Sequence, residues 1–234
     1  EEAQVVVVNT CSVREKPEQK VMSALGRIRQ VTGGSPDVLV GVAGCVAQQL
    51  GEAFFTKESQ VRLVAGSDGI SGAPAAIERL LEEPGLKLSL LDFTSHYAER
   101  EAGPETAEGP SDPVAYINIM QGCDNFCAFC IVPKVRGRAV SRPYEDILDN
   151  IKQVVSFGFK EVVLTGVNIA RYSYDNVDFE NLIEKVLNLH EDFRLRIGSI
   201  EPDGFGDKLI SLFEHPKLTP HLHLCLQSGS DEIL

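Results

Sequence analysis

Short apolar runs typical of strands alternate along most of the chain with amphipathic runs typical of helices. In the first part, the strand-like runs are 5–8, 38–43 and 61–65, and the helix-like runs are 15–30, 47–54 and 74–81. This alternation favours parallel pairing, because each helix returns the chain to the same end of the sheet. We therefore expect a small parallel α/β domain over residues 1–91.

A second alternation with longer spacing begins at residue 113. Its strand-like runs are 114–120, 161–165, 194–200 and 221–226, and its helix-like runs are 143–157, 179–189 and 207–214. Such repeats predict part of a TIM-type βα barrel, whose functional residues lie on the loops after the strands. The sequence stops at Leu234, where a fifth helix should begin. We therefore expect an incomplete barrel over 113–234.

The segment 92–112 between the two alternations is rich in acidic residues, glycine and proline, and it lacks apolar periodicity. This composition is typical of a linker.

Net charge and apolar content restrict the location and the partners. The formal net charge of −12 argues against nucleic-acid binding over the whole surface, so any such contact must be local. No apolar run is long enough to span a bilayer, and no export signal opens the chain, so we expect a cytoplasmic protein without a membrane partner. In that compartment the six cysteines favour metal binding or catalysis over disulfides.

Three of the cysteines, Cys123, Cys127 and Cys130, lie on one short loop after the first barrel strand. Three thiolates can bind three irons of a cubane cluster, which leaves the fourth iron open to chelate the amino and carboxylate groups of S-adenosylmethionine (SAM). A zinc site completed by a distant Cys or His is the alternative. The position at the mouth of a βα barrel favours the cluster.

Two further cysteines, Cys11 and Cys45, each follow a predicted strand of the first domain. If these strands are parallel, both cysteines lie at the same edge of the sheet, where α/β folds place ligands. Isolated cysteines are more often buried structural thiols, but two equivalent positions favour a shared site. Ser12 and Glu15 also predict a capping box that starts the next helix.

Polar and basic residues gather on the loops after the barrel strands. Lys134, Arg136, Arg138 and Arg142 form a dense basic segment, which is either a solvated loop or a contact for the SAM carboxylate or an RNA phosphate. The candidates at later strand ends are Gly166, Asn168, Ser199, Glu201, Gln227 and Ser228. For His221 and His223 we expect core or hydrogen-bonded roles, and for Cys225 a packing role.

The order of these motifs resembles a known family. CxxxCxxC after the first barrel strand, with Phe129 before the last cysteine, is the signature of radical SAM enzymes. The chain resembles the methylthiotransferase subfamily more closely. The motifs that carry this resemblance are NTCSVREKPEQKV, GCVAQQ, YINIMQGCDNFCAFCIVPKVRGRAVSRP, LTGVN, RIGSIEP and LQSGSDEIL.

The resemblance implies two 4Fe-4S clusters. Cys123, Cys127 and Cys130 would hold the catalytic cluster that cleaves SAM. Cys11 and Cys45 would be two of the three ligands of an auxiliary, sulfur-donating cluster, and the third would lie upstream of Glu1. Phe129, Arg136, Arg138 and the strand-end residues would contact SAM. The implied partners are transfer RNA (tRNA) and an electron donor such as flavodoxin or ferredoxin, with a monomeric chain.

The substrate branch stays open at this point. CSVREKPEQKV resembles the branch that modifies isopentenyl-adenosine in tRNA, whereas LTGVN and SIEP resemble the threonylcarbamoyl-adenosine branch. The other branch of this family modifies an aspartate of a ribosomal protein. A non-catalytic iron-sulfur or zinc protein is the alternative from another class, although such a protein has no need of a SAM pocket.

Overall fold

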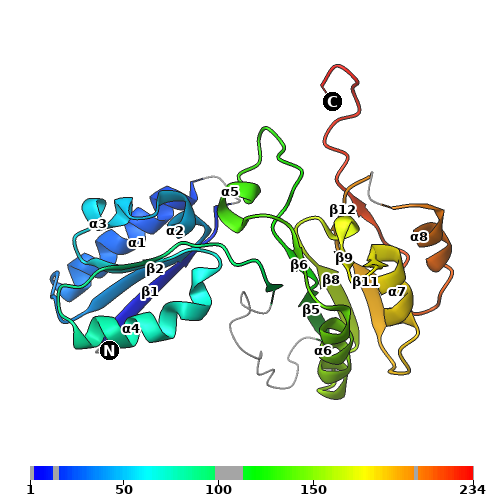
Figure 1. The fold of residues 1–234 in the computed structure, drawn as a ribbon, viewed down its shortest axis with the longest axis horizontal. Helices are drawn as coiled ribbons and strands as arrows, with labels where there is room; N and C mark the ends of the chain where they lie inside the picture. The colour runs from blue at the N-terminus through cyan, green and yellow to red at the C-terminus, as the bar shows by residue number, and fades with distance from the viewer. Residues whose placement is uncertain (1–2, 13–15, 98–112, 203–204, 234) are drawn as a thin grey trace. The chain divides into compact units, whose positions relative to one another are not determined.

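The structure, a computed structural model, describes residues 3–12, 16–97, 113–202 and 205–233. The chain divides into two compact units, Glu1–Pro104 with Asp124–Arg138, and Glu105–Cys123 with Ala139–Leu234. Each unit is built on a parallel sheet with helices (Figure 1). The domain boundaries expected from the sequence stay a prediction, and residues 98–112 of the expected linker lie outside the described residues.

The sheet of the first unit has four parallel strands that follow one another in chain order. They are β1 (Val5–Thr10), β2 (Leu39–Gly44), β3 (Val61–Ala65) and β4 (Leu88–Leu90). The first three were predicted. β4 was not, because three half-buried residues are too few to show a periodic pattern.

Helices pack on both faces of this sheet (Figure 1). One face carries α1 (Pro17–Thr32), α2 (Cys45–Leu50) and α3 (Ala53–Lys57), and the other carries α4 (Ala73–Glu82) after the 3-10 turn η1 (Gly69–Gly72). Burial of apolar side chains holds the helices of each face against the sheet. Phe54 is fully buried in the first core and Leu80 in the second.

Two local predictions for this unit are wrong. α1 begins at Pro17 after Lys16, whose φ of 63° is left-handed, so Ser12 is not its N-cap; Glu15 lies outside the described residues. Proline suits this first helical position because its φ is already helical and no N–H is needed there. The helix expected over 47–54 is broken into α2 and α3 by Gly51, which has a φ of 53°.

The second unit contains the start of a parallel βα array. β5 (Val114–Asn118), β8 (Glu161–Thr165) and β11 (Arg194–Ile197) form one sheet in that spatial order. β12 (Ser199–Ile200) continues directly after β11 and pairs in parallel with β13 (His223–Leu224). The four predicted barrel strands are thus confirmed: β8 has its expected bounds, and the other three are shorter or interrupted.

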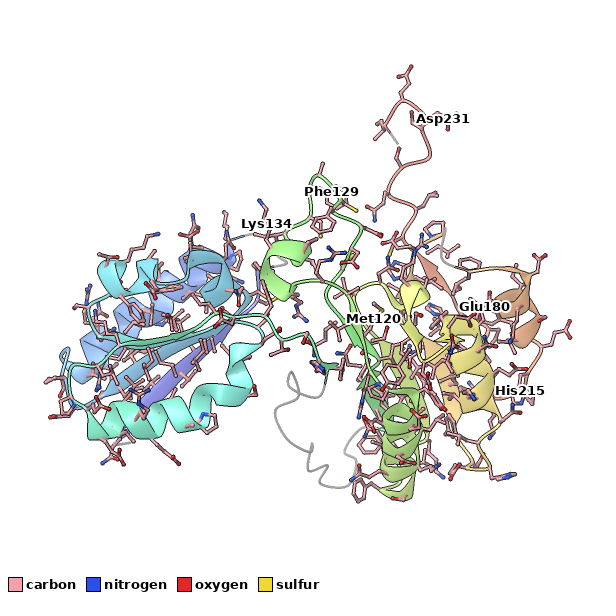
Figure 2. All side chains as sticks on the ribbon, viewed as in Figure 1. Met120, Phe129, Lys134, Glu180, His215 and Asp231 are labelled. Atoms are coloured by element: carbon pink, nitrogen blue, oxygen red, sulfur yellow. The ribbon has the colours of Figure 1, made fainter. Side chains whose placement is uncertain are left out.

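Three helices cover this array: α6 (Tyr144–Ser156), α7 (Phe179–Leu187) and α8 (Asp207–Leu212). Their apolar faces and the strands share one core, in which Ile151 and Leu182 are fully buried. Glu180 of α7 accepts hydrogen bonds from the backbone N–H groups of Gly206, at 2.6 Å, and Leu209, at 3.3 Å (Figure 2). This carboxylate satisfies the start of α8, which has no side-chain cap of its own.

Short elements fill the loops at the strand ends. Between β5 and α6, β6 (Met120–Gln121) pairs antiparallel with β7 (Val140–Ser141), and α5 (Val132–Arg136) lies between them in the sequence. After β8 come the 3-10 turn η3 (Ile169–Arg171) and the hairpin of β9 (Ser173–Tyr174) and β10 (Val177–Asp178). Within the described ranges, no helix is long and apolar enough to cross a membrane.

Gly44, at the end of β2, provides a test of the close approach of β1 and β2. Its φ is 89°, and a Cβ there would lie 2.3 Å from the carbonyl oxygen of Thr10. We expect Gly44→Ala to lower the free energy of unfolding by at least about 2 kcal/mol, because it combines left-handed strain with a backbone clash.

Gly26→Ala is the matched control, measured by the same chemical denaturation. Apart from its chain neighbours and the backbone of α1 itself, no atom lies within 4 Å of the position of its Cβ, so this change should stabilise the protein by about 0.5–1 kcal/mol. Equal stability of the two variants would contradict the close packing of these strand ends.

Candidate functional site

Cys11 and Cys45 lie at the same edge of the first sheet. β1 and β2 pair in parallel with Thr10 opposite Gly44, and each cysteine is the next residue of its strand end. This confirms the expected shared edge. Cys11 is exposed, whereas Cys45 opens α2 and is 3% exposed.

The hydroxyl of Thr10 ties these two strand ends together. It donates a hydrogen bond to the Ala43 carbonyl at 2.7 Å and accepts one from the Val46 N–H at 3.3 Å. The bond to Val46 satisfies one of the free N–H groups in the first turn of α2. Thr10 therefore fixes the backbone on both sides of Gly44 and Cys45.

The cysteine loop presents its three thiols unequally. Cys123 is buried, Cys130 is half-buried and Cys127 is exposed. The Cys130 N–H donates to the Cys127 carbonyl at 2.9 Å, which forms a tight turn between these two cysteines. In the described part of the chain, no three His, Cys, Asp or Glu side chains are close enough to bind a metal ion. Cluster ligation by these residues, and by Cys11 and Cys45, therefore stays a prediction.

Two of the four cations in the basic segment have side-chain partners. Arg138 pairs with Asp124 at 2.5 Å and lies over the ring of Phe126, and Arg142 donates to the Asn150 side chain at 3.1 Å. Arg136 is half-buried at the end of α5, and Lys134 is exposed.

Phe129, the aromatic of the cysteine motif, projects from its loop with 76% of its surface exposed (Figure 2). Its expected contact with SAM stays a prediction.

After β8, Gly166 and Asn168 have different structural roles. A Cβ at Gly166 would lie 2.6 Å from Ile169 and 2.9 Å from Met120, so packing alone requires glycine there. Asn168 is 3% exposed, and its buried side-chain oxygen Oδ1 accepts no hydrogen bond. A buried amide oxygen without a donor is costly, which suits a position that is completed by a bound ligand.

Four side chains alternate along β12 and β13 and the residue that follows each strand. Ser199 and Glu201 share one side of the first strand by period-two alternation, and their neighbours His223 and Cys225 share the same side of the second. The Ser199 hydroxyl and His223 Nδ1 are 2.9 Å apart. Glu201 and burial both act on Cys225, whose thiol pKa is raised, chiefly by burial.

His223 is the functional candidate that the sequence analysis undervalued. Its hydrogen bond was anticipated, but it is exposed and lies directly opposite Ser199 in the strand register. The sequence signal that could have identified it is the period-two alternation, which places His223 on the same side as the polar residues of the neighbouring strand. Beyond β13, Gln227 is exposed with a φ of 63°, and the Ser228 hydroxyl accepts from the Ser230 N–H at 3.1 Å.

Comparison with protein families finds two matches. Residues 1–66 match the family described as "Uncharacterized protein family UPF0004", and residues 117–234 match the "Radical SAM superfamily". The second match begins in β5 and includes the cysteine loop and the strand ends described above.

Curated relatives are similar over the whole chain. It is 50% identical over 247 aligned residues to the "tRNA-2-methylthio-N(6)-dimethylallyladenosine synthase" of Lawsonia intracellularis, and 50% identical over 238 to the synthase of the same name from Nitratidesulfovibrio vulgaris (strain DP4). The alignments cover 100% of this chain but 54% and 53% of those proteins. The chain thus spans about half their length, and its resemblance to methylthiotransferases is confirmed.

Solved structures share the fold at low identity. The radical SAM methyltransferase TsrM from Kitasatospora setae superposes with a TM-score of 0.67 at 13% identity, covering 100% of this chain and 50% of its own. The cobalamin-dependent radical enzyme OxsB gives a TM-score of 0.63 at 12% identity, with coverage of 99% and 36%. These likenesses confirm the expected α/β class with a partial barrel.

The raised pKa of Cys225 predicts the pH dependence of its alkylation. Because the thiolate is the reactive form, a raised pKa delays reaction until a higher pH than an ordinary thiol needs, which is about 8.5. We expect the alkylation rate of Cys225, followed by peptide mass spectrometry, to have its midpoint above that value. Glu201→Gln should lower the midpoint, since the Glu201 charge is the second cause of the shift. A midpoint at or below the ordinary value of about 8.5 would contradict a raised pKa of Cys225.

Proposed function

Because the chain belongs to the radical SAM superfamily, we propose that it acts in adding a methylthio group to a dimethylallyl-modified adenosine of tRNA. The observation that carries this proposal is the 50% identity, over all of this chain, to synthases named for that product. The cysteine loop at a βα-barrel strand end is consistent with it.

The dimethylallyl substrate is favoured over the alternatives left open by the motifs. The most similar relatives reported above carry dimethylallyladenosine in their names, and these findings lend no support to threonylcarbamoyl-adenosine. No finding favours the aspartate of a ribosomal protein or a non-catalytic metal protein. The cytoplasmic location, the flavodoxin or ferredoxin donor and the monomeric state stay predictions from the sequence.

In this proposal the cysteines divide between two clusters. Cys123, Cys127 and Cys130 would bind the catalytic cluster, and Cys11 and Cys45 would supply two ligands of the auxiliary one. When bound, these clusters and SAM supply a deoxyadenosyl radical for hydrogen abstraction and the sulfur for transfer. The donor set fits, because thiolates are the usual ligands of iron-sulfur clusters. The common sheet edge of Cys11 and Cys45 supports a shared site.

The strand-end residues would bind and orient SAM. Asn168 supplies a buried acceptor without a partner, which suits an N–H of the SAM amino group. Ser199 and Glu201 add a hydroxyl and a carboxylate beside the next strand. The expected set also includes Arg136, the residues Gln227 and Ser228 after β13, and Phe129, Arg138 and Gly166. Substrate phosphates would meet the exposed cations locally, since the chain as a whole is acidic.

Anaerobic assays with cysteine variants test the proposal. We expect Cys127→Ala to abolish reductive SAM cleavage, because none of the three ligands is spare. Cys45→Ala should leave SAM cleavage intact and stop methylthio transfer to tRNA, measured by mass spectrometry of digested nucleosides. Parallel reactions with tRNA bearing threonylcarbamoyl-adenosine should give no product. Bound zinc without SAM cleavage, or a preference for the second tRNA, would overturn the proposed function.

Asn168→Ala separates ligand binding from stability. Because Oδ1 has no partner to lose, the free energy of unfolding should change by less than about 1 kcal/mol. The dissociation constant of SAM from the cluster-loaded protein should rise by up to about tenfold, the effect of losing one hydrogen bond.

Asn181→Ala is the matched control for this test. Its side-chain oxygen accepts from Lys208 at 2.6 Å, so its loss should reduce stability and leave SAM affinity unchanged. The same pattern in Asn168→Ala would make Asn168 a structural residue.

A further inference from the structure

Arg138 contacts two residues at the opposite end of the cysteine loop. Its Nε lies 2.5 Å from Oδ1 of Asp124, fourteen residues earlier in the chain, and its guanidinium lies 5.7 Å from the ring centre of Phe126. Both partners lie between Cys123 and Cys127 in the sequence. The ion pair also raises the pKa of Arg138, so the guanidinium stays charged.

These contacts lie close in sequence to the strand pair that joins the two ends of the cysteine loop. Gln121 of β6 pairs with Val140 of β7. In the sequence, Asp124 is three residues after Gln121, and Arg138 is two residues before Val140. An additional link at this point shortens the part of the loop that is free to move, and so lowers the entropy lost when the cysteines are fixed.

The backbone beside the ion pair is in a conformation that needs support. Phe126 has a φ of 47°, in the left-handed region that bulky residues avoid. Its ring is 61% exposed, so burial does little to hold it, and the Arg138 guanidinium is a contact that covers one ring face. The left-handed turn at Phe126 sets the direction in which the chain enters Cys127.

We infer that Arg138 is a positioning residue for the iron-sulfur cluster, and that its contacts with Asp124 and Phe126 order the cysteine segment before iron binds. The inference rests on the proposed cluster at Cys123, Cys127 and Cys130. It gives Arg138 a role different from the SAM or RNA contact expected from the sequence, because its charge is already paired within the loop.

We expect the Arg138–Asp124 ion pair to affect how long the protein retains the cluster more than how stably it folds. The Arg138 and Asp124 side chains are 74% and 43% exposed, and exposed ion pairs add little to global stability. Local ordering of a ligand segment acts directly on metal affinity, because the cost of fixing the ligands opposes binding.

The test measures how fast a chelator removes iron from anaerobically reconstituted protein, with neither SAM nor RNA present. We expect Arg138→Ala and Asp124→Ala each to lose cluster absorbance about fivefold faster than the unchanged chain. The reversed pair, Asp124→Arg with Arg138→Asp, should recover at least half of that loss on a logarithmic scale. Arg79→Ala is the matched control, since it removes the exposed arginine of the Arg79–Glu83 ion pair at the end of α4 and should not alter the rate.

The possible outcomes distinguish a failure of this inference from a failure of the proposed function. If the unchanged chain takes up no iron-sulfur cluster, the proposed function fails. If it takes up the cluster and Arg138→Ala retains iron as long as Arg79→Ala does, the positioning role of Arg138 is wrong. Faster loss in both single variants without recovery in the reversed pair would also overturn it, because the ion pair itself would then be irrelevant.

Discussion

Hydrogen-bonded pairing of neighbouring parallel strands is the constraint on which both units depend. In the first unit it sets Thr10 against Gly44, and in the second it sets Ser199 against His223. Residues that follow such strands meet at one edge whatever their separation in the sequence. The same pairing demands glycine where backbones come too close for a side chain, as at Gly44 and Gly198, where a Cβ would lie 2.8 Å from the Leu164 carbonyl.

Much of this arrangement could be predicted from the sequence. Apolar runs gave the main strands because buried parallel strands need continuous apolar residues, and β2 is buried along its whole length. Two cysteines after two such runs were enough to predict a common edge. The barrel-like order of β5, β8 and β11 followed from the repeat spacing alone.

The remaining details depend on side-chain geometry that no periodic pattern encodes. The path of the cysteine loop determines which residue pairs with Arg138, and the sequence spacing between Asp124 and Arg138 does not identify them as partners. Gly166 was expected to contact a ligand, and its neighbours Ile169 and Met120 add a packing reason for glycine that the sequence does not show. His223 was considered only within its own strand in the sequence analysis, whereas its hydrogen-bond partner, Ser199, lies on the neighbouring strand.

The spatial order of the strands has a consequence for synthesis on the ribosome. In the sheet of the first unit and in the β5, β8 and β11 sheet of the second, every strand pairs with one that has already been made. Each new strand and its helix can therefore dock on a finished edge as they leave the exit tunnel. Each docked strand also covers the sheet edge that its predecessor left unpaired, which removes that edge as a site of aggregation.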